Sequence, residues 1–318
     1  MKTFDIITVN WNSGTQIKEC INSIQKAEFS NCILNKIVVV DNDSNDNSLQ
    51  IVEDLNYEKL EIIKNSDNFG FGKACNIGAK NSQSDFILFL NPDAMVYEDT
   101  FNKLFEYIEK NDTKDVAVYG VQLIGDDKIV QRNCAKVPSL SNFINRSLGL
   151  NKLNSKLFPS YTMENWDHLD TRKVDQVMGS FFMIKRDVFE KLNGFDERFF
   201  VYYEELELSK RIKDIGYKTI FVSESQAYHK GGGTSEQVKA KRLFYNTRSR
   251  LIYGFKHFGF YKGLFLMFFT FVVEPITRVI FSILKGQRSE ILETFRGFGM
   301  LYKDTFNSIK LGLKGKVK

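Results

Sequence analysis

The chain has 318 residues, of which 43% are hydrophobic and 26% charged, a balance typical of a folded globular protein and not of a disordered one. Four prolines and 21 glycines exclude collagen-like and proline-rich repeats. The net charge of +5 is uneven: residues 239–318 hold 16 Lys and Arg against 4 Asp and Glu, a net of +12, so the remainder carries −7. A basic C-terminal region indicates nucleic acid or an anionic membrane as a partner.

The cysteines indicate a reducing compartment. Cys20, Cys32, Cys75 and Cys134 form no C-x-x-C pair, which excludes a secreted disulfide scaffold and disfavours a cysteine-based zinc site. The residues after Met1 run directly into a strand pattern without a signal-peptide pattern, so a cytosolic location is expected.

Residues 4–120 alternate short apolar runs with helical patterns. Apolar residues three or four positions apart predict helices over 17–24 and 101–108. The runs 38–40 and 87–90 are apolar throughout, as in strands that are buried on both faces. The βαβαβ order predicts an α/β fold with a mostly parallel sheet and a ligand site beyond the carboxyl ends of the strands. The predicted strands are 6–9, 37–40, 62–63, 86–90 and 116–118.

The next segment, 137–176, lacks clear periodicity and is expected to be a loop-rich insertion. Regular patterns return beyond it and predict strands at 177–184 and 219–222 and helices at 186–192 and 204–215. The expected division is therefore one domain over 1–238, with the insertion inside it, and a basic helical region over 239–318.

The C-terminal region contains an apolar run at 263–273, followed by Glu274, Pro275 and Arg278 and a second run at 279–284. A spanning helix needs about 20 apolar residues without charges, so the stretch falls narrowly short, and an in-plane membrane helix with basic flanks is favoured. The alternative is a helix docked on the core or on a second copy of the chain, as in a homodimer. The apolar run suits lipid better than nucleic acid, which is not an expected partner.

Polar clusters follow four of the predicted strands, at 10–14, 41–46, 65–73 and 91–93. Each alone is ordinary turn and capping chemistry, but together at the carboxyl edge of one sheet they would line a cleft. In the last cluster, Asp93 is the hard oxygen ligand that Mg²⁺ or Mn²⁺ prefers. The alternative for Asp93 is a helix cap.

Two further groups of residues are candidates for catalysis and metal binding. Glu204, Glu205 and Glu207 lie at a predicted helix start, where partial burial would raise a carboxyl pKa as a general base requires. The alternative is a solvated helix face. His229 precedes the glycines 231–233, an arrangement that suits metal ligation and amide contacts to phosphate, with a simple glycine linker as the alternative.

These motifs together resemble family 2 glycosyltransferases with the GT-A fold, and most closely their rhamnosyltransferase-like branch. They occur in the family's order over about residues 5–235, which makes the resemblance far more specific than any single motif. The matching segments are 9–12, 40–44, 68–78, 90–93, 179–184, 194–200, 204–208 and His229 with its glycines.

The resemblance implies an inverting transfer of a sugar from a nucleoside diphosphate sugar, either dTDP-rhamnose or a UDP-sugar, with Mg²⁺ or Mn²⁺ as cofactor. The implied acceptor is a hydroxyl of a glycan or of a polyprenyl-diphosphate-linked sugar, in cell-surface polysaccharide synthesis. Together with the basic apolar tail, this predicts a cytoplasmic enzyme held peripherally at the inner face of the cell membrane.

The same resemblance assigns the site. Asp93 and His229 match the metal contacts, and Glu205 matches the catalytic base, with Glu204 as the alternative. The implied acceptor side comprises Gly179, Ser180 and Trp166, the last of these in the insertion. The implied donor-binding residues are Thr8, Val9, Asn10, Asn12, Asp41, Asp43, Asn68, Gly70, Lys73, Asn76, Asn91 and Pro92.

Two positions depart from the family pattern. Asn91 replaces the first carboxylate of the D-x-D motif, so the metal is expected to rest on Asp93 with the diphosphate and His229. The acidic pair is Glu204-Glu205 where the family has Glu-Asp, which leaves open the carboxylate that reaches the acceptor. The alternative functions are a sugar nucleotidyltransferase, although the loop after the first strand does not resemble its phosphate loop, and a non-catalytic sugar-nucleotide binding protein.

Overall fold

The computed structural model describes residues 1–111, 114–231 and 239–314 and divides the chain into two compact units. The first unit consists of Met1–Lys136, Trp166–Asp196 and Glu204–Gly233. The second consists of Val137–Asn165, Glu197–Tyr203 and Thr234–Lys318. All of the site residues predicted from the sequence belong to the first unit.

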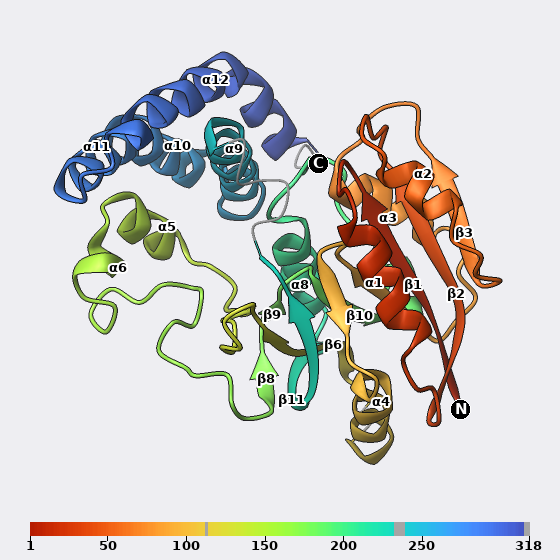
Figure 1. The fold of residues 1–318 in the computed structure, drawn as a ribbon. Helices are drawn as coiled ribbons and strands as arrows, with labels where there is room; N and C mark the ends of the chain where they lie inside the picture. Colours follow the sequence, from red (N-terminus) through yellow and green to blue (C-terminus); the bar gives the residue numbers. More distant parts are fainter. Residues whose placement is uncertain (112–113, 232–238, 315–318) are drawn as a thin grey trace. The chain divides into compact units, whose positions relative to one another are not determined.

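The first unit is built on a nine-stranded sheet in the order β3-β2-β1-β4-β10-β6-β11-β5, with β8 paired to β11 (Figure 1). Strands β1 to β4 are mutually parallel, and β11 is parallel to β6, whereas β10 is antiparallel to both of its neighbours. The predicted α/β fold with a mostly parallel sheet is confirmed. The strands are β1 (Lys2–Asn10), β2 (Cys32–Asp41), β3 (Leu60–Lys64), β4 (Phe86–Leu90), β5 (Ala94–Val96), β6 (Val116–Ile124), β7 (Cys134–Ala135), β8 (Arg172–Val174), β9 (Gln176–Val177), β10 (Phe181–Lys185) and β11 (Lys218–His229).

Helices cover the sheet through the apolar stripes that the sequence predicts. Those of the first unit are α1 (Gln16–Gln25), α2 (Ser48–Glu53), α3 (Phe71–Ala79), α4 (Thr100–Asn111), α7 (Arg186–Lys191) and α8 (Glu204–Asp214). Helix α1 buries Ile17, Cys20, Ile21 and Ile24, and every residue of β4 is buried, as expected for a central strand. These packed layers fix the strand ends that carry the polar clusters.

The strand register brings those clusters to one edge of the sheet. Asn10, the last residue of β1, pairs with Asp41, the last residue of β2. Strand β4 ends at Leu90, opposite Phe181, with which β10 begins. Strand β11 ends at His229, directly beside β5. Residues far apart in the chain therefore meet at this edge.

The single strand predicted over 177–184 is wrong, because the structure contains two strands there. Strand β9 ends at Val177 and pairs with β7, and β10 starts only at Phe181. Between them, the Met178 N–H donates to the Asn133 carbonyl at 2.8 Å, and the chain joins the main sheet only where β10 begins.

The segment predicted as a loop-rich insertion contains helices α5 (Leu140–Ser147) and α6 (Leu150–Leu153). Helix α5 begins with a capping box, in which the Ser139 hydroxyl accepts the Asn142 N–H and the Asn142 side chain accepts the Ser139 N–H. Because Asn stands where the motif usually has Glu or Gln, this helix start carries a weak sequence signal.

The second unit also contains α9 (Lys239–Phe258), α10 (Phe260–Phe268), a π-helical turn η2 (Phe269–Val273), α11 (Glu274–Leu284) and α12 (Arg288–Leu313) (Figure 1). Residues 260–284 form one continuous helix, in which the π-helical turn η2 directly precedes Pro275, a local adjustment of the kind that accommodates a proline within a helix. Among the described residues this is the helix that is long and apolar enough to cross a membrane by length and composition, with a mean hydropathy of 1.9. The stretch therefore meets the length and composition of a spanning helix, whereas the expectation from Glu274, Pro275 and Arg278 places it narrowly below that requirement.

Candidate active site

The Asn10 side chain organises the ends of β1 and β2. Its Nδ2 donates to Asp41 Oδ1 at 2.7 Å and to Ser48 Oγ at 2.9 Å. Asp41 Oδ2 accepts the backbone N–H of Ser44 at 3.1 Å. Asn10 and Asp41, two of the residues expected to bind the sugar-nucleotide donor, are both buried. Their hydrogen bonds hold the loop after β2 in place.

Asn12 and Asp43 shape the two loops at this edge. Both have positive φ angles, 51° and 59°, a conformation that Asn and Asp adopt more readily than most residues. Asn12 Oδ1 accepts the Asn45 N–H at 2.7 Å, while Asp43 is exposed. Thr8 and Val9 are buried at the end of β1.

Asn68 and Gly70 form the start of α3. Gly70 donates its N–H to Asn68 Oδ1 at 3.0 Å and has a φ of 82°, which favours glycine. Asn42 Nδ2 donates to the Gly70 carbonyl at 3.1 Å and ties this turn to the loop after β2. One turn into the helix, Lys73 Nζ lies 4.2 Å from the ring centroid of Phe69. This turn therefore places the N-terminus of α3 and the ammonium group of Lys73 at the edge of the site.

Asn76 has a different setting. Its Nδ2 donates to the Phe195 carbonyl at 2.9 Å, and its Oδ1 accepts the Phe195 N–H at 2.8 Å. The side-chain amide therefore fixes the turn after α7 against α3. Gly72 permits this approach, because a Cβ there would lie only 3.2 Å from Phe195 Cβ.

Asp93 and His229 are brought together, as the sequence predicts. His229 Nε2 lies 3.5 Å from Asp93 Oδ1, and the two side chains are about one-tenth exposed. His229 Nδ1 lies 2.9 Å from Gln131 Oε1, and Gln131 Nε2 donates to the His229 carbonyl at 2.7 Å. Because Gln131 Nε2 is engaged by the His229 carbonyl, Gln131 Oε1 is the atom placed to accept Nδ1–H, and Nε2 is directed toward Asp93.

This pair fits a divalent cation. A carboxylate oxygen and an imidazole nitrogen are both ligands of Mn²⁺-type ions, and a hydrogen bond from Nδ1–H to Gln131 would leave Nε2 available for the metal. Among the described residues no group of three or more His, Cys, Asp or Glu side chains is placed to hold a metal. Two protein ligands are typical of sites where diphosphate oxygens and water complete the shell.

Glu205, at the start of α8, lies beside Gly179. A Cβ built on Gly179 would be 3.7 Å from the Glu205 carboxyl, and the Gly179 and Leu206 N–H groups donate to that carboxyl. Burial raises the pKa of Glu205 above its ordinary value, although these N–H groups lower it. A held carboxylate with a raised pKa suits a general base near neutral pH.

The neighbouring carboxylates differ from Glu205. Glu204 is almost fully buried, packed against Gly72 of α3. Glu207 is completely buried and accepts two bonds from Arg211, whose other nitrogens donate to the carbonyls of the turn after α7. Glu207 is therefore part of the scaffold.

A hydrogen bond between backbone groups links the segment of Asp93 to the segment that holds Glu205. The Asn91 N–H, two residues before Asp93, donates to the Ser180 carbonyl at 3.1 Å, and the adjacent Gly179 holds Glu205. Asn91 and Pro92 are half-buried, whereas Ser180 is fully buried. The end of β4, the start of β10 and the start of α8 thus form one continuous edge.

Trp166 is not brought into this group. Its ring stacks on His168 at a centroid distance of 3.9 Å, and the Arg172 guanidinium lies 4.2 Å from the ring. The edge of the Trp166 ring packs against Phe221, early in β11. Of the glycines after His229, Gly231 is described, whereas Gly232 and Gly233 lie outside the described residues.

Comparisons with known proteins decide the family. The model of Glycosyl transferase family 2 matches residues 5–193, more than half of the chain. The chain belongs to glycosyltransferase family 2. The predicted family is thus confirmed, and the protein is an inverting glycosyltransferase with the GT-A fold.

Three similar proteins illustrate the relationship. This glycosyltransferase is 29% identical to rhamnosyltransferase WbbL of Escherichia coli (strain K12), over 69% of its own chain and 81% of the relative. It is 21% identical to the N-acetylglucosaminyl-diphospho-decaprenol L-rhamnosyltransferase of Mycobacterium tuberculosis, over 81% and 86% of the two chains. The mannosyltransferase PcManGT from Pyrobaculum calidifontis, solved with GDP-Man and Mn²⁺, shares the fold with a TM-score of 0.53 at 14% identity, over 96% and 87% of the chains.

Gln131 is a residue of the glycosyltransferase site that sequence reasoning missed. It makes two bonds to His229, which lies 98 positions away in the chain. A glutamine in a loop carries no pattern, so only the pairing of β6 with β11 reveals this contact.

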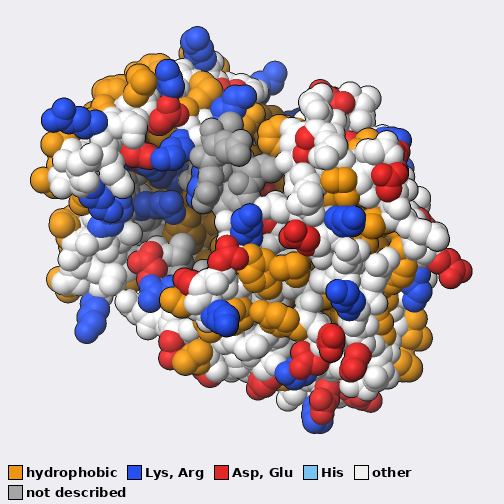
Figure 2. Space-filling model, viewed as in Figure 1, with side chains coloured by type: hydrophobic (Ala, Val, Ile, Leu, Met, Phe, Trp, Pro, Cys, Tyr) orange, Lys and Arg blue, Asp and Glu red, His pale blue; other side chains and the backbone are white. Residues whose placement is uncertain are grey.

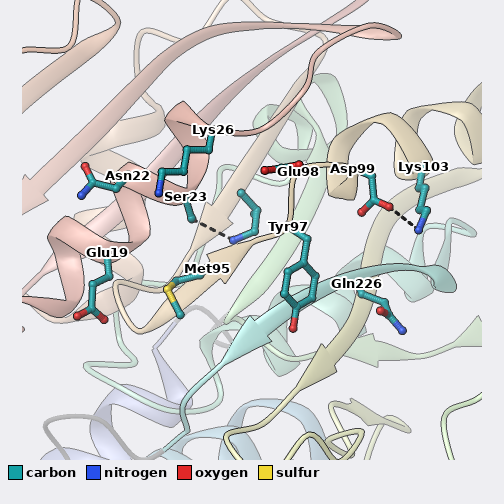
Figure 3. Close-up of a pocket in the computed structure, with 11 residues that line it drawn as sticks. Glu19, Asn22, Ser23, Lys26, Met95, Tyr97, Glu98, Asp99, Lys103 and Gln226 are labelled. Atoms are coloured by element: carbon teal, nitrogen blue, oxygen red, sulfur yellow. Dashed lines mark hydrogen bonds and ion pairs between the residues drawn. The ribbon is translucent and has the colours of Figure 1, made fainter.

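A separate hollow of about 770 Å³ lies between α1, β5 and the start of α4 in this glycosyltransferase (Figure 3). Tyr97 and Met95 line it, and the ion pair of Asp99 with Lys103 stands at its side. None of the predicted site residues lines this hollow, so it is distinct from the edge that carries Asp93 and Glu205.

Proposed function

We propose that this glycosyltransferase transfers a rhamnosyl group from dTDP-rhamnose to a hydroxyl of a lipid-linked diphosphosugar, with Glu205 as the base. The observation that carries the proposal is that the Asp93–His229 pair and the Gly179-bound Glu205 share one edge of the sheet. The names of the two relatives, both rhamnosyltransferases and one acting on a diphospho-decaprenol, support the donor and the acceptor.

Glu205 accepts the proton of the acceptor hydroxyl while that oxygen attacks the anomeric carbon. The new carbon–oxygen bond forms on one face of the sugar as the bond to the diphosphate breaks on the other, so the configuration inverts in a single displacement. The Gly179 N–H holds the Glu205 carboxylate in place. The raised pKa of Glu205 makes this carboxylate a better proton acceptor. Fixing both substrates in one site supplies much of the remaining rate enhancement.

Negative charge develops on the departing diphosphate, and three described groups are placed to meet it. Asp93 and His229 would hold Mn²⁺ or Mg²⁺, which neutralises charge on a leaving group when bound. Lys73, in the first turn of α3, adds a positive charge at the same edge. These roles are supported by the geometry of the edge and by the solved mannosyltransferase that contains Mn²⁺.

The nucleotide base is assigned to the loops of Asn10 and Asp41. The two oxygens of Asp41 accept bonds from Asn10 and Ser44, and a carboxylate offers about four acceptor positions in all. The remaining positions suit the imide N–H of thymine or uracil. Asn68 and Gly70 shape the adjoining turn for the ribose and diphosphate.

The second unit docks on a phospholipid bilayer in this proposal. Along the helix 260–284 the buried positions include the polar Thr270, Glu274 and Ser282, whereas the exposed positions are apolar apart from Lys262, which differs from the usual pattern of a soluble amphipathic helix. Figure 2 shows hydrophobic side chains among Lys and Arg side chains over this region. The net charge of +12 over 239–318 complements an anionic surface. The exposed stripe consists of Tyr261, Phe265, Phe268, Val272, Ile276 and Ile280.

Vesicle binding tests the docking. Phe268→Asp is expected to release the protein from anionic vesicles, because an aspartate in the stripe cannot enter the apolar layer. Ile129→Asp places the same change at an exposed isoleucine of the first unit and is expected to leave binding intact. Equal binding by the Phe268→Asp variant would contradict the docking.

A donor panel tests the reaction. The enzyme is incubated with Mn²⁺, a polyprenyl-diphosphate-linked N-acetylglucosamine and, in turn, dTDP-rhamnose, UDP-glucose, UDP-N-acetylglucosamine or GDP-mannose. We expect nucleoside diphosphate release and an extended lipid product with dTDP-rhamnose, with the anomeric configuration inverted by NMR. Product formation with another donor alone would contradict the rhamnosyl assignment.

A further inference from the structure

The second unit holds a group of basic side chains for which sugar transfer gives no role. Arg146 lies in the last turn of α5, Lys152 in α6, Arg278 in α11, and Lys285 directly after α11. Lys152 Nζ is 4.8 Å from the ring centroid of Phe281, so α6 and the end of α11 are neighbours. We call these four side chains the basic cluster.

Carboxylates neutralise only part of this charge. Glu274 is buried and has both oxygens engaged, one by Arg250 and the other by Arg278 at 2.9 Å. Arg146 instead donates to a neutral partner, the Tyr161 hydroxyl, at 3.0 Å. The carboxylate of Glu274 is thus already shared between two guanidinium groups.

The charges around the cluster do not balance. Arg250 and the basic cluster are five cations, whereas the carboxylates that act on Arg146 are those of Glu274 and Glu164, so the cations outnumber these carboxylates. Burial lowers the pKa of Lys152, and the charges of the other three members of the cluster lower it further. An anion bound among these side chains would relieve their mutual repulsion.

The surroundings of the cluster are apolar and exposed. Large aliphatic side chains on α6, just beyond it and at the end of α11 are between 60% and 75% exposed: Leu153, Leu157, Ile283 and Leu284. Figure 2 shows Lys and Arg side chains interspersed with hydrophobic ones over α5, α6, α10 and α11. Cations set in an apolar surface match the phosphate at the head of a lipid better than a soluble anion.

We propose that Arg146, Lys152, Arg278 and Lys285 form a binding site for a phosphate group carried by a membrane lipid. The arginines pair with phosphate oxygens through two N–H groups, and the lysines act as point charges. Two lipids supply this chemistry, an anionic phospholipid and the polyprenyl diphosphate of the acceptor. The site rests on the proposed membrane docking and gives it a specific ligand.

The double variant Lys152→Gln/Lys285→Gln tests the site. Both side chains lie at the surface, with Lys152 covered only in part by Phe281, so the fold is expected to be retained, which thermal unfolding verifies. The matched control is Lys303→Gln/Lys310→Gln, which removes the same charge from exposed positions of α12. Lys303 lies fifteen residues beyond the start of that helix, roughly 22 Å along its axis.

Binding is measured by flotation with vesicles of phosphatidylcholine alone, with added phosphatidylglycerol, or with an added polyprenyl diphosphate. The cluster variant is expected to lose about 30-fold in the affinity that the added lipid confers, or about 2 kcal/mol at about 1 kcal/mol per basic residue. The control is expected to lose less than about threefold. A greater loss on the diphosphate vesicles identifies the polyprenyl diphosphate of the acceptor as the ligand, whereas a greater loss on the phosphatidylglycerol vesicles identifies the phospholipid headgroup, and equal losses on both mean that the site binds either phosphate.

Two results would overturn the site. Equal losses by the cluster variant and the control would mean that binding follows net charge alone, and unchanged binding by the cluster variant would mean that the lysines meet no lipid phosphate. Sugar transfer is assayed separately on detergent-solubilised acceptor. A failure of the base assignment would appear there as turnover by Glu205→Gln, without any effect on the vesicle result.

Discussion

Replacing Glu205 by glutamine tests the assignment of the base. Glutamine has the shape of glutamate and keeps an acceptor oxygen for the Gly179 and Leu206 N–H groups, so the side chain is expected to stay in place. Only the ability to take up a proton is lost. General base catalysis contributes about 10²–10⁴-fold to rate, so kcat is expected to fall by that factor, or about 3–5 kcal/mol at 1.36 kcal/mol per tenfold.

The pH dependence follows from the raised pKa of Glu205. The wild-type rate is expected to fall as the pH drops through this raised pKa, because a protonated carboxyl cannot act as base. The free energy of unfolding changes with pH in the opposite direction to the rate. A carboxyl whose pKa is raised in the folded state stabilises the fold at low pH, and this contribution is lost as the pH rises. Glu205→Gln should therefore unfold at a higher temperature than the wild type at pH 8, with the difference shrinking toward pH 4.

The assay is initial-rate release of nucleoside diphosphate, with donor affinity measured by calorimetry. The donor affinity of Glu205→Gln is expected to match the wild type, and Glu204→Gln, the matched control, is expected to keep kcat within about tenfold. Normal turnover by Glu205→Gln together with a large loss of kcat in Glu204→Gln would contradict this assignment and identify Glu204 as the base.

Two further predictions concern the scaffold and the metal pair. Gly78→Ala places a Cβ 2.6 Å from Ile7 and 2.8 Å from Val40. This variant should lower the free energy of unfolding by about 1–3 kcal/mol in denaturant titrations. The control Gly299→Ala, whose Cβ meets open space, should not lower it. Gln131→Leu removes the partner of His229 Nδ1 and should weaken Mn²⁺ affinity by about 10–100-fold in an electron paramagnetic resonance titration, with thermal stability checked in parallel; an unchanged affinity would argue against ligation by the histidine.

Much of the fold is predictable from the sequence because local patterns specify it. The continuous apolar run 38–40 and the periodic apolar stripe of α1 are both local signals, and both elements form where they are expected. The position of β10 between β4 and β6 has no local signal, since it depends on pairing between segments far apart in the chain. The start of α5 escapes prediction because Asn142 takes the place of the usual capping residue.

The site is predictable where its residues belong to motifs. Asp93 and His229 come from separate motifs and lie 3.5 Å apart as expected, but nothing in the sequence indicates that Gln131 joins them. Asn76 shows the converse, because its motif position suggests the donor whereas its amide binds the Phe195 backbone. Amides serve ligands and turns equally well, so residue type alone cannot separate these roles.

The most direct test of the account is a crystal structure of the enzyme with Mn²⁺ and dTDP, with the metal located by its anomalous signal. We expect one manganese peak between Asp93 Oδ1 and His229 Nε2, with the diphosphate beside it and the thymine near Asp41. A manganese peak elsewhere, or a nucleotide bound away from this edge of the sheet, would contradict it.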